Sequence, residues 1–200
     1  MALVVAANVG VFVAQQAVGA DGATWHQRFG LLPRALWEGE RVGVAGAIQP
    51  YALVLLTAGF LHAGIGHLAI NLAYLGLLGP SVERATGWWR FGVVWLAATI
   101  AGGLTHAAVH PQALVPAIGA SAGVSGLIGL VTLGGKAGLL IGAIWLGVQL
   151  AGALTQIEDV FGPAVAGDAH LGGFGVGLAA GALFRLNVRR RRARMAPKPR

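Results

Sequence analysis

A few polar side chains stand alone in long apolar segments of this chain, and they are the residues best placed to do chemistry. Ser121 lies in the segment Gly119-Ala120-Ser121-Ala122-Gly123, and His170 lies in Ala169-His170-Leu171-Gly172-Gly173. Polar and ionisable groups are costly inside a membrane, so they indicate function by default. Because a serine hydroxyl beside an imidazole base is an activated nucleophile, the two segments together indicate nucleophilic catalysis.

The surroundings of Ser121 allow two interpretations. The serine is expected in the first turns of a helix that follows Pro116. Unpaired backbone N–H groups and the positive end of the helix dipole lie there, and they would stabilise a developing oxyanion. Glycine, alanine and serine also line close-packed faces of membrane helices, so composition alone leaves a purely structural role open.

His170 shares a helix face with a stripe of glycines at positions 173, 177 and 181. Small residues spaced by four let two helix backbones approach closely. The histidine therefore points at the same neighbouring helix that the glycines contact. If this neighbour is the helix that carries Ser121, His170 comes within hydrogen-bond reach of the serine. A lone histidine would otherwise be structural in most cases.

His67 and Asn71 are four residues apart, so they lie one above the other on one helix face. Two neutral hydrogen-bond donors that point the same way can stabilise an oxyanion. A structural hydrogen-bond pair between helices is the alternative that spacing alone leaves open.

No metal or cofactor site is expected from the sequence. Asp168 lies two residues before His170, about 200° around a helix. We therefore interpret it as an interfacial or water-facing carboxylate and favour a Ser-His dyad over a triad. The histidines lack the His-Glu-x-x-His motif, and no carboxylate stands beside them at metal-ligand spacing. Dinucleotide and P-loop glycine motifs are absent too.

The composition indicates what must position these residues. Of the 200 residues 56% are hydrophobic and 10% are charged, against roughly 25% charged in a soluble domain. The mean hydropathy is +0.72. These values exclude a soluble globular fold and a disordered chain. The chain has no cysteine, which excludes disulfides, thiolate metal sites and a cysteine nucleophile.

A membrane span takes about 20 residues, so the chain has room for about six. We predict an all-α, polytopic bundle of six transmembrane helices over residues 1–186, followed by a basic tail at 187–200. Charged and Trp-containing residues 21–50 are expected at the membrane interface. Pro80, Ser81, Glu83 and Arg84 are predicted to form the turn after the second span. The predicted spans are 2–20, 51–78, 88–109, 117–133, 137–154 and 164–186.

The positive charges predict the orientation. Seven of the 14 Lys and Arg residues lie between Arg189 and Arg200. The positive-inside rule then places both termini in the cytoplasm. The Ala-, Gly- and Arg-rich composition favours a bacterial inner or plasma membrane. The tail is interpreted as a topology anchor, with binding of anionic lipids as the alternative. Membrane lipids are expected partners, and nucleic acid is not.

Three separated motifs resemble, in the family's order, those of rhomboid intramembrane serine proteases of the bacterial six-span type. The resemblance covers about residues 50 to 185. The motifs are Gly59-Phe60-Leu61-His62 with His67-Leu68-Ala69-Ile70-Asn71, then Gly119-Ala120-Ser121 with Ser125-Gly126, and then Ala169-His170-Leu171-Gly172-Gly173 with Gly177. Glu83-Arg84 with Gly87 also fits the family's acidic turn.

The resemblance implies a role for each matched residue. Ser121 would be the nucleophile and His170 the general base. His67 and Asn71, with the Ser121 backbone N–H, would stabilise the oxyanion. The implied activity is cleavage of transmembrane-helix substrates near the outer membrane surface, without a cofactor. Residues 21–50 would form the membrane-embedded first loop. Supporting positions would be His62, Gly119 and Gly173.

The chain departs from the family pattern at two places. Ala122 follows the nucleophile position, where glycine is usual, and the literal Gly-x-Ser-Gly tetrad is Gly123-Val124-Ser125-Gly126. Leu53-Val54 stand where a Trp-Arg pair is usual. This change puts in doubt both the arginine partner of Glu83 and the anchoring of the first loop.

Two other classes of function compete with the protease. A catalytically silent rhomboid-like protein would bind transmembrane clients without cleaving them, and the retained Ser121 and His170 argue against it. A small transporter or channel would carry paired charges in mid-span or broken helices in inverted repeats, and neither is found in the sequence. The sequence specifies neither the substrate nor the oligomeric state.

Overall fold

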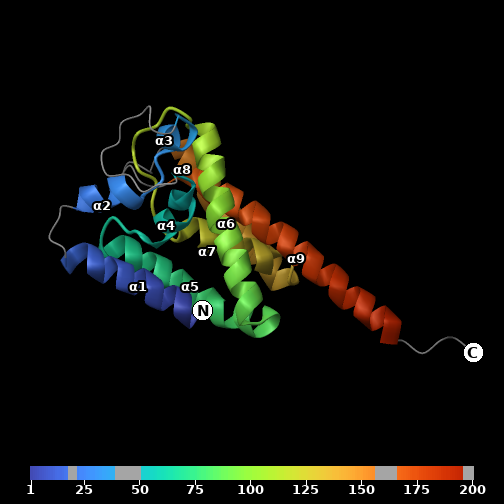
Figure 1. The fold of residues 1–200 in the computed structure, drawn as a ribbon. Coiled ribbons are helices and arrows are strands. Elements are labelled where there is room, and N and C mark those ends of the chain that lie inside the picture. The colour runs from blue at the N-terminus through green and yellow to red at the C-terminus, as the bar shows by residue number, and fades with distance from the viewer. Residues whose placement is uncertain (18–21, 39–50, 156–165, 196–200) are drawn as a thin grey trace, which may run out of the picture.

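The chain is helical almost throughout in the computed structural model, which describes residues 1–17, 22–38, 51–155 and 166–195. Within those ranges the extended pairing is one isolated bridge between Leu31 and Ala117. The predicted all-α class is confirmed (Figure 1). The described helices are α1 (Ala2–Ala17), α2 (Gly22–Phe29), α3 (Pro33–Glu38), α4 (Val54–Thr57), α5 (Ile65–Thr86), α6 (Trp88–Val109), α7 (Ser121–Thr132), α8 (Lys136–Thr155) and α9 (Gly167–Met195), with short 3-10 turns η2 (Tyr51–Leu53) and η3 (Ala58–Phe60).

Two of the described helices, α5 and α6, are long and apolar enough to cross a membrane by length and composition. The apolar stretches of α1, α7 and α8 are shorter. The predicted count of six spans therefore stays a prediction. The predicted bounds of the third and fifth spans agree closely with those of α6 and α8. The predicted bounds of the second, fourth and sixth spans differ from those of the helices in the structure.

The second predicted span is wrong at both ends. Residues 51–78 do not form one helix, because η2, α4 and η3 come first and the chain is extended at Leu61, with φ −87° and ψ 148°. Helix α5 then continues through Pro80 to Thr86. Buried packing of Leu75 and Val82 on either side of the proline favours a continuous helix there. The predicted turn residues Glu83 and Arg84 thus belong to the last turns of α5.

The sixth predicted span differs at its carboxyl end. Helix α9 does not stop at residue 186 but runs on to Met195, and it extends away from the other helices in Figure 1. The basic residues of the predicted tail therefore begin on a helix. The predicted loop at 156–163 lies outside the described residues.

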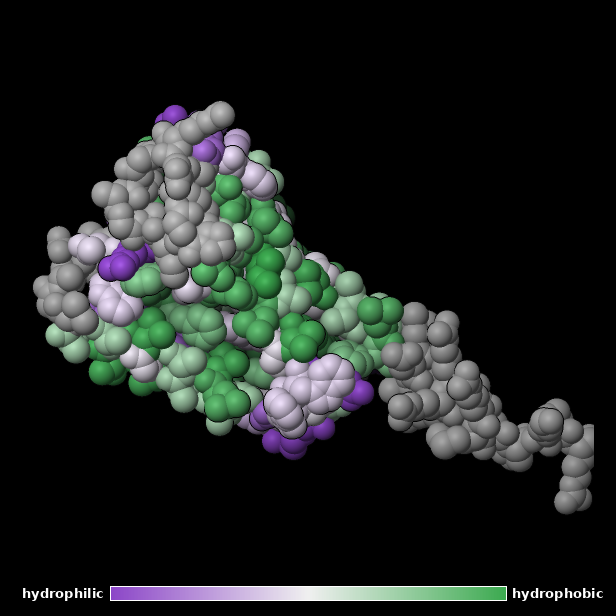
Figure 2. Space-filling model, viewed as in Figure 1, coloured by the Kyte–Doolittle hydropathy of each residue, from purple (hydrophilic) through white to green (hydrophobic). Residues whose placement is uncertain are grey.

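Helix α7 lies at the centre of the core. Its apolar residues pack with residues of α5, α6, α8 and α9 in one buried cluster. Large apolar side chains on the outer faces are exposed, such as Leu77 of α5 and Ile144 of α8, as suits a surface that faces lipid. Figure 2 shows hydrophobic residues over most of the face in view, with hydrophilic residues near its upper and lower edges.

Glycines bring α7 and α9 into backbone contact. A Cβ atom added at Gly173 would collide with the Ala122 carbonyl group, and one at Gly177 would collide with the Gly126 carbonyl group. On the other side, a Cβ at Gly129 would collide with the Phe174 carbonyl oxygen. The glycine stripe after His170 thus packs on the helix that carries Ser121, which is the condition under which the sequence predicts that the two residues come near each other.

Candidate active site

Ser121 is the first residue of α7, four residues later than the predicted start of the fourth span. The N-cap residue, Ala120, is buried and offers no side-chain hydrogen bond to the helix end. Backbone N–H groups of the first turn therefore stay available, because a helix leaves its first four donors unpaired. An oxyanion at the Ser121 side chain would meet these donors and the positive end of the helix dipole.

Gly119 shapes the turn into α7. Its φ of +121° is in the region that favours glycine, and its N–H donates to the Ala58 carbonyl oxygen at 2.8 Å. A Cβ at Gly119 would lie 2.8 Å from His67 Nε2 and 3.7 Å from Ser121 Oγ. The His67 ring therefore lies against Gly119, and Ser121 shares the same small space.

The hydrogen bonds of His67 suit a donor at Nε2. Its Nδ1 accepts the Ala63 N–H at 3.4 Å, which favours the tautomer with the proton on Nε2, the atom near Gly119. Asn71 is buried one turn further along α5, and its Nδ2 donates to the His67 carbonyl oxygen at 2.9 Å. One amide hydrogen of Asn71 is therefore used within its own helix, and the second remains for another acceptor.

His170 lies on α9 and is held by α8. Its Nδ1 is 3.0 Å from Gln149 Oε1. Since a side-chain carbonyl oxygen only accepts, Nδ1 carries the proton and Nε2 is left with a free lone pair. Among the described residues, no hydrogen bond joins His170 to Ser121. Sequence reasoning did not include Gln149, although a lone amide in an otherwise apolar span was a usable signal.

His62 supports the site through packing and its backbone. The side chain is 1% exposed, and neither ring nitrogen has a hydrogen-bond partner in the described part of the chain. Its ring lies edge-on to that of His67, with centroids 5.0 Å apart. The His62 N–H donates to Gln15 Oε1 at 3.3 Å, which ties α1 to the turn before α5. Burial lowers the pKa of nearby His26 on α2 below its ordinary value.

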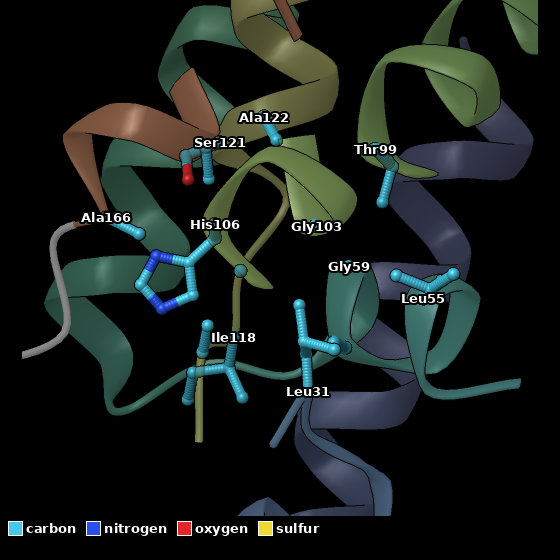
Figure 3. A pocket seen from close by; sticks show the side chains of 14 residues that line it. Leu31, Leu55, Gly59, Thr99, Gly103, His106, Ile118, Ser121, Ala122 and Ala166 are labelled. Carbon is cyan, nitrogen blue, oxygen red and sulfur yellow. The ribbon is translucent and has the colours of Figure 1, made fainter. Parts of the chain in front are cut away.

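A pocket opens beside Ser121. Its lining comes from η3, α6, α7, the start of α9 and the segments around Leu31 and Ile118. The Ser121 hydroxyl and the His106 ring face the same space in Figure 3. Ser121 is thus reachable from outside the helix core.

The first loop is anchored near this pocket by backbone hydrogen bonds and by one side-chain hydrogen bond. Leu31 and Ala117 exchange two hydrogen bonds of 3.0 and 2.8 Å, and the Arg34 N–H donates to the Ala113 carbonyl oxygen at 3.1 Å. Trp37 Nε1 donates to the Ala107 carbonyl oxygen at 2.8 Å on α6. These contacts hold the described part of the loop without the Trp-Arg pair of the family pattern.

Glu83, the residue whose arginine partner the family pattern puts in doubt, also has a partner. Its Oε1 accepts the amino group of Met1 at 2.6 Å.

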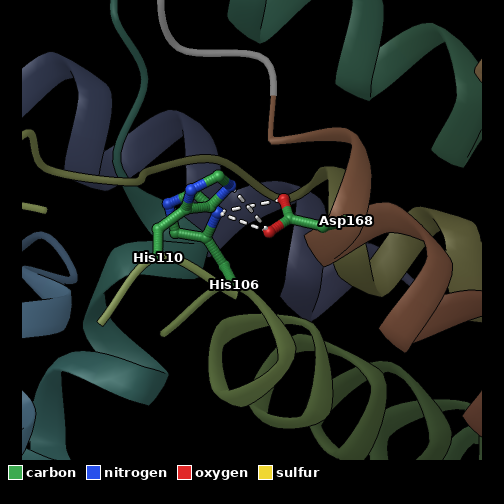
Figure 4. Close-up of side chains that lie close together, drawn as sticks. All are labelled: His106, His110 and Asp168. Atoms are coloured by element: carbon green, nitrogen blue, oxygen red, sulfur yellow. Dashed lines mark hydrogen bonds and ion pairs between the residues drawn. The ribbon is translucent and has the colours of Figure 1, made fainter. Parts of the chain in front are cut away.

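Asp168 does not pair with His170. Its carboxylate lies 3.0 Å from His106 Nδ1 and 3.3 Å from His110 Nε2 (Figure 4). The preference for a dyad over a triad stays a prediction, and the carboxylate of Asp168 is engaged by His106 and His110. The expectation that no carboxylate lies beside the histidines is wrong, because Asp168 lies beside His106 in the fold. The sequence did not show this pair because the two residues are 62 positions apart. The four-residue spacing of His106 and His110 was a signal for two of the three residues in this group.

Comparison with known proteins identifies the family. The sequence model described as "Rhomboid domain" matches residues 49–187, and the chain therefore belongs to the rhomboid family. Membership makes it a multi-pass membrane protein with a helical bundle. The family resemblance of the three motifs is confirmed.

Similar proteins include two that are named as proteases and one that is named as inactive. "Rhomboid-type serine protease 2" of Emericella nidulans is 32% identical over 61% of this chain and 25% of its own length. "Rhomboid protease GluP" of Bacillus subtilis is 41% identical over 38% of this chain and 14% of its own length. "Inactive rhomboid protein 1" of Drosophila melanogaster is 40% identical over 37% of this chain and 5% of its own length. The chain thus matches a quarter or less of the length of each of these relatives.

Proposed function

We propose that this chain is an intramembrane serine endopeptidase that cleaves transmembrane-helix substrates with a dyad of Ser121 and His170. The observation that carries the proposal is the packing of α9 on α7. Gly173 contacts the Ala122 carbonyl group, and His170 lies one turn before Gly173 on the same face. Ser121 directly precedes Ala122. The base and the nucleophile are thus carried by adjacent turns of two helices in backbone contact.

The tautomers favoured by the hydrogen bonds of His67 and His170 suit the proposed roles of these two histidines. With the Nδ1 proton donated to Gln149, His170 Nε2 can accept the proton of Ser121 Oγ. The hydroxyl oxygen attacks the scissile carbonyl carbon, and the oxyanion receives hydrogen bonds from the Ser121 N–H, His67 Nε2 and Asn71. His170 then donates the proton to the leaving amine, and water hydrolyses the acyl-enzyme by the same base.

The length of α7 supports a site below the membrane surface. Twelve residues span about 18 Å at 1.5 Å per residue, whereas the hydrocarbon core is roughly 30 Å thick. With residues 133–135 at the cytoplasmic face, Ser121 would lie below the opposite surface. A substrate helix must unwind there to expose its carbonyl group, so we expect small or helix-breaking residues near the cleavage site. The proposed membrane is a bacterial inner or plasma membrane, with both termini in the cytoplasm.

The test uses the purified chain in detergent, a fluorophosphonate probe and a model transmembrane substrate. We expect Ser121→Ala to abolish labelling and cleavage, and His170→Ala to reduce both by at least a hundredfold. The chain has two further serines, which serve as matched controls. Ser81→Ala changes an exposed side chain, and Ser125→Ala tests the Gly-x-Ser-Gly tetrad directly. Full cleavage by the Ser121 variant would refute the proposal.

A second candidate is a catalytically silent rhomboid-like protein that binds transmembrane clients. The similarity to a relative named as inactive favours it. Absence of probe labelling in the folded wild-type chain, together with retained binding of a transmembrane segment, would support this candidate.

A further inference from the structure

Three side chains meet at the junction of α6 and α9, and we call them the His-His-Asp cluster. His106 belongs to the last turn of α6, His110 is its C-cap residue, and Asp168 is the second residue of α9. The one suitable ligand atom of each residue lies within 4.8 Å of the other two. Figure 4 shows the two imidazole rings side by side, with the carboxylate facing both.

The distances from each histidine to the carboxylate are close to those between two ligands of one metal ion. A tetrahedral zinc ion with bonds of 2.0–2.1 Å has ligand atoms about 3.3 Å apart. His106 Nδ1 lies 3.0 and 3.1 Å from the two carboxylate oxygens, and His110 Nε2 lies 3.3 Å from Asp168 Oδ2. Only the two histidines need to approach each other, by rotation of their side chains.

The Asp168 carboxylate of the cluster is held in place by a hydrogen bond, and the cluster is accessible to solvent at His110. The side chains of His106 and Asp168 are 14% and 19% exposed, whereas that of His110 is 52% exposed. The Ala169 N–H donates to Asp168 Oδ1 at 2.9 Å, which holds the carboxylate in place as second-shell hydrogen bonds do in metal sites. A metal ion can therefore enter past His110, and water can complete the coordination.

We propose that His106, His110 and Asp168 form a binding site for a divalent transition-metal ion, with Zn²⁺ as the ion that best fits two imidazole nitrogens and one carboxylate oxygen. The bound ion would link the end of α6 to the start of α9. Since His106 also lines the pocket beside Ser121, the metal site adjoins that pocket. The proposal does not depend on protease activity, because metal binding is measured without a substrate.

The test is metal binding by the full chain in detergent, with any polyhistidine tag removed and the protein stripped with a chelator. Zn²⁺ is titrated against a chromophoric chelator, and Co²⁺ is added in a parallel sample as a spectroscopic probe. We expect about one ion per chain and the intense visible absorption of four-coordinate Co²⁺. Asp168→Asn and His110→Ala should each weaken binding at least tenfold.

The variants keep the result interpretable. Asp168→Asn preserves the shape of the side chain, and His110 is exposed, so both proteins are expected to fold, which circular dichroism checks. His26→Gln is the matched control, since it removes a histidine on α2 and should leave Zn²⁺ binding unchanged. Binding of clearly less than one equivalent, or equal affinity in wild type and both cluster variants, would show an ordinary histidine–aspartate ion pair and overturn the proposal.

Discussion

At the scale of single residues, the proposed chemistry depends on which nitrogen of each histidine carries the proton. His67 and His170 have opposite tasks, because one must donate a proton from Nε2 and the other must accept one there. Their Nδ1 partners differ accordingly. Ala63 offers an N–H to His67, and Gln149 offers an oxygen to His170. Gln149 is thus a positioning residue that selects the tautomer of the proposed general base.

Replacing Gln149 should therefore slow the chemical step. Gln149→Met keeps the length of the side chain but removes the acceptor, so we expect kcat to fall about tenfold to a hundredfold with a small change in KM. Gln149→Glu keeps an acceptor oxygen and should retain more activity than the Met variant. Steady-state cleavage of a transmembrane substrate by folded protein measures both. Equal kcat values in wild type and Gln149→Met would remove the assigned role.

Two features of the structure require glycine at position 119, its positive φ and the close approach of the His67 ring. In Gly119→Ala the positive φ costs about 1–3 kcal/mol, and the new Cβ pushes the His67 ring away from the site. We expect lower thermal stability and at least a tenfold loss of fluorophosphonate labelling. Gly76→Ala is the matched control, since a Cβ there meets nothing within 4 Å and φ is ordinary. A labelling rate unchanged by Gly119→Ala would contradict this account.

Much of the candidate site could be predicted from the sequence, because its residues fall in short motifs with regular helical spacing. His67 and Asn71 share a face of α5, and His170 shares a face of α9 with its glycines. Gln149 and the Asp168 pairing could not be predicted in this way. Their contacts join segments 21 and 62 residues apart, and periodicity within one helix carries no information about such pairs.

At the scale of the elements, the packing of α7 on α9 determines whether nucleophile and base can meet. Backbones in contact leave no room for a side chain at the crossing, which explains glycines on both helices. The distance between Ser121 and His170 is then set by the helix backbones and not by flexible side chains.

A methyl group at the crossing should separate the two residues. Gly177→Ala places a Cβ against the Gly126 carbonyl group, so the helices must shift apart, at a cost of about 1–3 kcal/mol. We expect a lower melting temperature and a large loss of cleavage, although residue 177 lies two turns from His170. Gly175→Ala on the same helix meets nothing within 4 Å and should behave as wild type. Similar activity of the two variants would argue against control by helix packing.

Hydropathy predicted both bounds of α6, but it failed at the start of α7, where a tertiary contact precedes the helix. Helix α6 begins after Gly87, which has φ +85°, and its bounds match the prediction. Helix α7 begins at Ser121 because Ala117, four residues earlier, pairs with Leu31 of the first loop. The segment before Ser121 is apolar, so its composition alone predicts a helix although the chain is paired in a bridge there. Because α7 begins at Ser121, the N–H groups of the first turn of this helix are available for the proposed reaction.

At the scale of the whole molecule, the proposed orientation decides which side of the membrane the pocket faces. Ser81 near the end of α5 and Leu114 after α6 are separated by α6, one of the two helices long enough to span a membrane. The two residues should therefore lie on opposite sides. The positive-inside rule assigns Ser81 to the cytoplasmic side and Leu114, with the loop close to the pocket, to the outer side.

Because the chain has no cysteine, single cysteines can report this orientation without background labelling. Ser81→Cys and Leu114→Cys both change exposed side chains. In intact bacterial cells or right-side-out vesicles, a membrane-impermeant maleimide should label Leu114→Cys at once and Ser81→Cys only after the membrane is opened. Both should label equally in detergent, which controls for accessibility. The reverse pattern in intact vesicles would invert the topology and place the pocket beside Ser121 on the cytoplasmic side.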